Sequence, residues 1–256
     1  MSDVAGSLGQ GKLIVLPPAF GGGDGIEVGI GLSRWWARQL RAAGRQTVWF
    51  MMGVPETSSP RQLQVFAAWP ERQVAELLVG ALKARYGLAP EFNPMRTRAK
   101  IGVRLFEVTA EGRVQAIDAW TFEGDNTGVP ALAFEVVQGV SRCLGVKPSA
   151  LSWQDAFGSG DEIAAMYYLS ASGAVALLEE GFSTSAELAI KALGATLETA
   201  PLMQPAVDLM QDLLLAMVKV LGASELQLAA VLRTGREALG RSPPDWDGII
   251  DRVLSG

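Results

Sequence analysis

The spacing of hydrophobic and polar positions in the first fifty residues predicts a strand, a loop and a helix. The apolar run Leu13–Leu16 ends at a doubled proline, and Gly21–Gly25 forms a glycine-rich turn. The next segment is amphipathic up to Gly44, with apolar residues at helical spacing on one side and arginines on the other. Asp24 is the expected N-cap, because a glutamate follows three residues later. This order is typical of the opening half of a β–α–β unit.

Weaker patterns follow this unit. Gln46–Met52 is rich in aromatic and β-branched residues, which predicts a second strand. Apolar residues then recur at helical spacing through Arg61–Tyr86, so we expect a helix there, interrupted at Pro70 and closed by a glycine. Leu88–Met95 holds two prolines, and we interpret it as a short edge strand or a loop.

The clearest β pattern is a hairpin. Lys100–Val108 and Arg113–Phe122 are rich in strand-forming residues and flank a short loop that contains a glycine. In the first arm, polar residues and Phe106 alternate with aliphatic ones, which predicts a half-exposed face. A helix from about Pro130 to Leu144 follows, ended by a glycine.

After Pro148 the strand pattern stops, and alanine and leucine dominate. Helical spacing predicts helices at about residues 162–180, 185–199, 203–221, 225–239 and 245–254. The chain is therefore predicted to combine α/β and all-α parts, an α+β or α/β fold class. We expect a flexible lead at residues 1–11, a mixed-sheet α/β domain at 12–148 and a helical-hairpin domain at 149–256.

Composition argues against several kinds of chemistry. The chain has no histidine and one cysteine, Cys143, which excludes Ser-His-Asp triads, histidine-ligated zinc and thiolate clusters. We therefore predict no catalytic residues, no cofactor and no metal site. The net charge is −5 and the basic residues are scattered, so we expect neither nucleic-acid binding nor membrane insertion. Met1–Gln10 lacks a signal-peptide pattern, and this favours a cytoplasmic protein.

Three motifs in the first 147 residues resemble the amino-terminal domain of TolB and related modules of bacterial proteins. They are an opening Leu13-Ile-Val-Leu-Pro-Pro with Gly31-Leu32 in the next helix, Ala84-Arg-Tyr-Gly-Leu, and a closing hairpin with Ala119-Trp120-Thr-Phe-Glu-Gly-Asp before Cys143-Leu-Gly-Val. The helices after residue 148 are similar to the tetratricopeptide repeats that often follow such modules. The resemblance implies a non-catalytic α/β module, followed by helical repeats, that contacts other proteins.

Two candidate sites remain. The turn Gly22, Gly23, Asp24 and Gly25 lies between a strand and a helix N-terminus, where anions bind because free N–H groups converge there. The turn does not fit a dinucleotide-binding glycine pattern, and its acidic residues would repel phosphate, so we interpret it mainly as a flexible turn. The alternative is that this loop serves a small-molecule or nucleotide sensor.

The second candidate is a partner-binding surface formed by Trp35, Trp36, Trp120 and Phe106. Adjacent Trp35 and Trp36 cannot both fill one narrow helical stripe, so we expect one of them to cover a domain junction or a partner. We therefore predict a protein-interaction, assembly or scaffold protein that contacts a protein partner or another copy of itself. The predicted modes are strand addition at a sheet edge and a helix docked in a groove.

Overall fold

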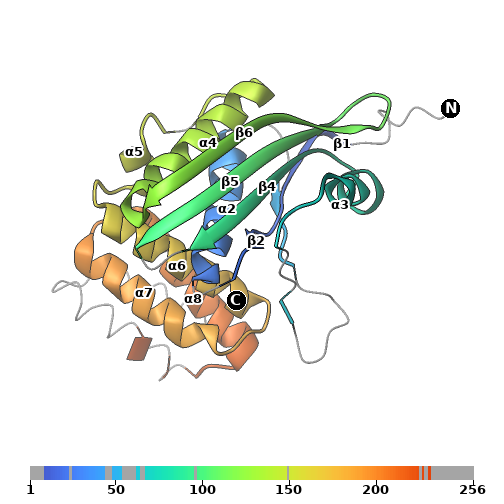
Figure 1. Cartoon of the computed structure of the whole chain (residues 1–256). Coiled ribbons are helices and arrows are strands. Elements are labelled where there is room, and N and C mark those ends of the chain that lie inside the picture. Colours follow the sequence, from blue (N-terminus) through green and yellow to red (C-terminus); the bar gives the residue numbers. More distant parts are fainter. Residues whose placement is uncertain are drawn as a thin grey trace.

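A mixed β-sheet followed by several helices gives the chain an α+β fold (Figure 1). The structure is a computed structural model, and it describes residues 9–22, 25–43, 48–53, 62–63, 67–94, 97–148, 150–224, 227 and 230–231. The predicted helices at 225–239 and 245–254 lie largely or wholly outside the described residues, as does most of the lead at 1–11.

The strands of the sheet follow the order β3-β1-β4-β5-β6, and β2 pairs with the end of β4. They are β1 (Gly9–Val15), β2 (Ala19–Phe20), β3 (Val48–Phe50), β4 (Ala84–Pro94), β5 (Arg98–Val108) and β6 (Val114–Asp125). β1 is parallel to β3 and β4, whereas β4, β5 and β6 are antiparallel neighbours. Among the described strands, β6 therefore lies at one edge of the sheet.

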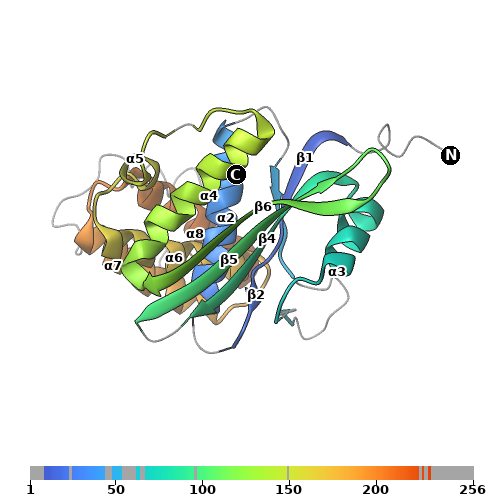
Figure 2. The same cartoon turned by 45° about the horizontal axis from the view of Figure 1, so that its top comes forward.

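The helices cover the two faces of the sheet unequally (Figure 2). They are α2 (Ile26–Ala43), α3 (Glu71–Ala75) continued by the π-helical η1 (Glu76–Ala81), the 3-10 turn η2 (Asn126–Gly128), α4 (Val129–Leu144), α5 (Trp153–Phe157), α6 (Glu162–Glu179), α7 (Ser185–Thr199) and α8 (Gln204–Leu221). α2 and α4 lie on one face, and α3 with η1 covers part of the other. α6 packs on α2, and α7 and α8 pack on α6.

Local sequence patterns predicted most of these elements. The first strand, the helix after the glycine turn, the hairpin and the 130–144 helix are confirmed, as are the three helices that became α6, α7 and α8. Gly145 ends α4 with a backbone φ of 66°, a left-handed conformation that favours glycine. α5 was not predicted, although Ser152 caps it by accepting a hydrogen bond from the Asp155 backbone N–H at 3.2 Å.

The stretch from Arg61 to Met95 corrects two predictions. Among the described residues of this stretch the helix covers Glu71–Ala81, and the residues predicted as its end, Ala84–Tyr86, start β4. β4 is a central strand of eleven residues rather than a short edge strand or a loop. Its Pro90 is tolerated because pairing with β1 stops at Leu88 and pairing with β2 starts only at Glu91, so no parallel neighbour needs an N–H from Pro90.

The helices after residue 148 share one hydrophobic core with α2 and the sheet. Their closest approach is at two glycines. A Cβ built on Gly173 of α6 would lie 2.6 Å from the carbonyl carbon of Glu27 in α2, and one built on Gly31 would lie 2.7 Å from that of Leu169. The two backbones touch here because neither helix carries a side chain at the crossing. The predicted domain boundary between residues 148 and 149 follows α4, and the hydrophobic core continues across it.

Candidate functional site

The structure places both adjacent tryptophans in the interior, which corrects their prediction as partner-binding residues. Trp35 and Trp36 are 1% and 0% exposed. Trp36 donates a hydrogen bond from Nε1 to the carbonyl oxygen of Ala133 in α4 at 2.9 Å. Trp35 stacks on Phe157 of α5 with ring centroids 4.5 Å apart. Helices lie on both sides of α2, so each tryptophan has its own intramolecular neighbour, and Trp35 covers the junction with the later helices.

Phe106 is also buried, so its prediction as a partner-binding residue is corrected too. It packs beneath α3 and η1, which cover this end of the hairpin, and the guanidinium carbon of Arg104 lies 5.3 Å from its ring centroid. Trp120 differs from the other three because it is half-buried, lying against Gly139 of α4. Of the four predicted residues, Trp120 alone retains an accessible surface.

The glycine turn lies beside the end of β4. Gly22 and Gly25 have φ angles of 101° and 99°, a left-handed backbone that suits glycine. A Cβ built on Gly25 would lie 3.7 Å from Pro94. Gly23 and Asp24 lie outside the described residues, and the anion-binding role of this turn therefore stays a prediction.

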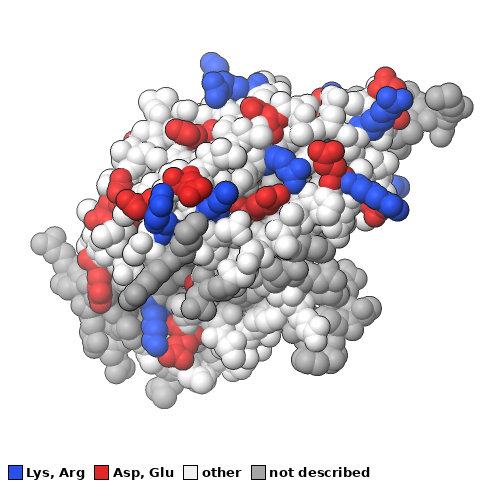
Figure 3. Space-filling model, viewed as in Figure 1, with Lys and Arg blue, Asp and Glu red and all other residues white. Residues whose placement is uncertain are grey.

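One part of the sheet has no described helix over it, and we call it the open corner. It comprises exposed and half-exposed residues at three strand ends, on the face that carries α3: Glu91, Asn93, Lys100, Gly102, Thr121 and Glu123. A shallow hollow of about 410 Å³ lies over these residues. Figure 3 shows acidic and basic side chains interspersed on the face that Figure 1 presents.

Polar contacts fix the border of the open corner. Arg104 donates hydrogen bonds to the Glu91 carboxylate at 3.0 Å and to the Trp69 carbonyl oxygen at 2.6 Å. Lys100 lies 3.9 Å from Glu123, and both side chains are more than half exposed, so this ion pair contributes little. The centre, at Gly102, carries no side chain, which leaves room over the sheet.

The outer edge of β6 presents free backbone groups next to the open corner. The Ala119 N–H donates to the Asp118 carboxylate at 2.8 Å, so it faces away from β5. Backbone groups alternate in direction along an antiparallel strand, and the N–H groups of Thr121 and Glu123 therefore face outward as well. In the part of the chain that the structure describes, no strand pairs with this edge.

Two features hinder the pairing of another strand with β6 before Thr121. The pairing with β5 shifts between Leu105 and Phe106, which leaves Ile117 as an extra residue in a β-bulge. Asp118 also occupies the Ala119 N–H, and its other carboxylate oxygen accepts a weak hydrogen bond from Cys143 at 3.7 Å. Burial and the nearby Asp118 raise the pKa of the Cys143 thiol, so the neutral donor form is favoured. The accessible edge therefore begins at Thr121.

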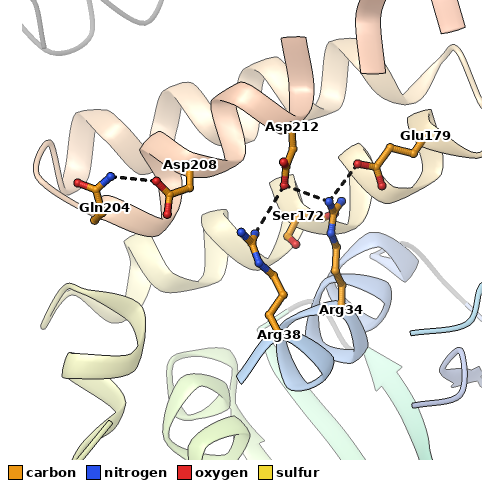
Figure 4. A network of polar contacts seen from close by, with 7 residues as sticks. All are labelled: Arg34, Arg38, Ser172, Glu179, Gln204, Asp208 and Asp212. Carbon is orange, nitrogen blue, oxygen red and sulfur yellow. Dashed lines mark hydrogen bonds and ion pairs between the residues drawn. The ribbon is translucent and has the colours of Figure 1, made fainter. Parts of the chain in front are cut away.

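A second polar cluster joins three helices on the other side of the sheet (Figure 4). Arg34 of α2 is 13% exposed and donates to Glu179 of α6 at 3.0 Å and to Asp212 of α8 at 3.2 Å. It also donates to the Ser172 carbonyl oxygen at 3.3 Å. Burial raises the pKa of Glu179, although Arg34 acts in the opposite direction. This cluster fastens α6 and α8 to α2.

The described residues contain no group of three or more cysteine or acidic side chains that could hold a metal ion. Among the described helices, none combines the length and the apolar character that a membrane span needs. The sequence prediction missed Thr121 and Glu123 as site residues. Their strand was predicted, but its place at the sheet edge depends on how distant strands pair.

Comparison with known proteins yields structural matches only. No protein-family model matches the chain, and no curated protein matches it. Two solved structures of PelC dodecamers from Paraburkholderia phytofirmans, one of a point variant, are 19% identical in sequence. Each match covers 52% of this chain and 86% of the PelC chain, with TM-scores of 0.33 and 0.34. The resemblance to TolB and to tetratricopeptide repeats stays a prediction, since none of these matches concerns either family.

Proposed function

We propose that this chain is a non-catalytic protein-interaction module that binds an extended, basic segment of a partner protein by strand addition at β6. The observation that carries the proposal is the outward-facing backbone of Thr121 and Glu123, on an edge that no described strand pairs with. Natural proteins usually protect long edge strands, most often with lysine, proline or a bulge. Here the protection stops at Asp118, and the rest of the edge is accessible.

The charge of β6 supports the choice of partner. Its ionisable side chains are Asp118, Glu123 and Asp125, and no lysine or arginine lies between Val114 and Asp125. Opposite charges across paired strands stabilise the pairing by about 0.2–1 kcal/mol each, and like charges oppose it. A partner strand with lysine or arginine at alternate positions is therefore favoured. A second copy of β6 would place acidic residues against acidic residues, which disfavours self-association through this edge.

The open corner supplies space for the side chains of such a partner. A bound strand points alternate side chains to each face of the sheet, and those on the α3 face would lie beside Thr121 and over the hollow of about 410 Å³. On the opposite face they would meet Trp120, the predicted partner residue that keeps an accessible surface. Backbone hydrogen bonds supply affinity and these side-chain contacts supply selectivity.

The test is a peptide titration followed by fluorescence polarisation. Thr121→Pro removes the outward N–H, and Thr121→Val is the matched control because it keeps that N–H. We expect an extended peptide with alternating lysines to bind the wild type and T121V alike. Loss of one to two edge hydrogen bonds, at about 1 kcal/mol each, should weaken binding to T121P about tenfold. Equal binding of an otherwise identical peptide with alternating glutamates, or an unchanged affinity in T121P, would contradict the proposal.

A further inference from the structure

A second hollow, of about 340 Å³ and as open to solvent as the one at the open corner, lies beside the Arg34 cluster between α2, α8 and β3. Its described lining consists of Arg34, Ala37, Arg38, Arg41, Phe50 and Asp212. It is separate from the open corner, which lies on the opposite face of the sheet. Three guanidinium groups and one carboxylate are among its described lining.

The cations are placed there by the helix itself. Arg34, Arg38 and Arg41 lie on one side of α2 because residues three and four positions apart share a helix face. Arg34 is held in place by ion pairs with Glu179 and Asp212, whereas 37% of the Arg38 side chain is exposed. A rigid guanidinium and a more accessible one thus line the same space.

Arg38 also has a buried donor without an acceptor. Its Nη1 atom is shielded from solvent and makes no hydrogen bond. The nearest carboxylate oxygen, on Asp212, lies 3.7 Å away, which is too long for a hydrogen bond, and that oxygen already accepts from Arg34 at 3.2 Å. A buried donor left unpaired destabilises a protein, and native structures pair nearly all of them. Nη1 is ion-paired with Asp212 and shielded from solvent, so a ligand would contact the exposed part of the Arg38 side chain instead.

The other described lining residues are apolar. Ala37 is buried, and Phe50 presents a half-buried ring from β3. The volume lies in the range of small-molecule sites, which combine apolar walls with a few directed polar groups. Guanidinium groups match the geometry of phosphate oxygens with two parallel hydrogen bonds. We propose that this hollow binds a small organic phosphate, with the phosphate at Arg38 and the organic part against Phe50 and Ala37.

The proposal does not depend on partner binding at β6, and it is tested with the full chain. The probes are inorganic phosphate and phenyl phosphate, titrated by calorimetry. We expect both to bind, phenyl phosphate about tenfold more tightly because its ring is removed from water against Phe50. Arg38→Gln should weaken both at least tenfold. Arg142→Gln, at an exposed arginine of α4 far along the chain, should leave both unchanged.

Nuclear magnetic resonance of the ¹⁵N-labelled wild type keeps the test decisive if R38Q fails to fold. Shifts that saturate with phenyl phosphate at the amides of Arg38, Arg41 and Phe50 would support the site. Absence of binding at millimolar concentrations of both probes would overturn the proposal. It would also be overturned by binding that R38Q and R142Q weaken equally, or by shifts that map away from α2 and β3.

Discussion

Replacing Gly173 with alanine should separate α6 from α2 and destabilise the whole chain. The added Cβ would lie 2.6 Å from the carbonyl carbon of Glu27 and closer still to its oxygen. Both atoms belong to the backbone of a helix, so no side chain can rotate away to make room. A carbon and a carbonyl oxygen are in contact at about 3.4 Å, so the two helices would have to move apart by more than about 1 Å.

The expected loss follows from two opposing effects. Overpacking of a close-packed core typically costs about 1–3 kcal/mol, and a clash between two rigid backbones belongs at the upper end or beyond. Alanine regains up to about 1 kcal/mol over glycine in a helix interior. The net prediction is a loss of about 2–3 kcal/mol, which corresponds to a fall in Tm of about 5–10 °C for a chain of this size.

Gly194→Ala is the matched control. Gly194 lies inside α7, and a Cβ built there meets no atom within 4 Å, so this variant should gain about 0.5–1 kcal/mol. Both variants are unfolded in urea while tryptophan fluorescence and far-ultraviolet circular dichroism are recorded. We expect coincident transitions for the two signals, because one core joins the sheet and the helices. Equal stability of G173A and G194A would refute the close helix crossing.

Three further predictions concern other contacts. Trp36→Phe should lose about 1–3 kcal/mol in urea unfolding, because the smaller ring leaves a cavity in the core and the indole hydrogen bond to Ala133 at 2.9 Å is lost. Wild-type stability in W36F would contradict this packing. Burial raises the pKa of Glu179, so the native state binds the carboxyl proton more tightly than the unfolded state does. The contribution of Glu179 to stability therefore falls as pH rises from the ordinary glutamate pKa of about 4.3 through the raised pKa. Urea unfolding between about pH 4 and 7 should therefore show that the stability of Glu179→Gln increases relative to wild type as pH rises. The control Glu198→Gln, at an exposed position, should follow the wild type at every pH. If both variants follow the wild type, the raised pKa of Glu179 is refuted. Asp118→Ala frees the Ala119 N–H, whereas Asp118→Asn keeps an acceptor for it. The basic peptide should therefore bind the alanine variant about fivefold more tightly than the asparagine variant. Equal affinities would show that Asp118 does not hinder strand pairing at this edge.

The sequence predicted those elements that depend on local patterns. The hairpin and the long helices could be recognised because strand alternation, helical spacing and terminal glycines are properties of neighbouring residues. β4 could not, because its partner β1 is distant in sequence and because Pro90 argues against a central strand. Only the observed pairing shows that Pro90 falls between two neighbours that do not need its N–H.

The site was less predictable than the fold. The sequence predicts that one of Trp35 and Trp36 covers a domain junction or a partner, because one helical stripe cannot hold both. Helices on two sides of α2 bury them separately, and Trp35 lies at the junction with the later helices. The acidic composition of β6 is readable from the sequence, yet its place at a free edge is not. The helices that contain Gly31 and Gly173 could also be predicted, but the sequence does not indicate that they cross at these two glycines.

The proposed function is tested most directly by amide hydrogen exchange of the ¹⁵N-labelled chain with and without the basic peptide. An N–H that becomes paired with a bound strand exchanges more slowly, so the account predicts new protection at Thr121 and Glu123. Ala119 should stay unchanged, because its N–H already donates to Asp118. Protection confined to other elements, with Thr121 and Glu123 exchanging as in the free protein, would contradict strand addition at β6.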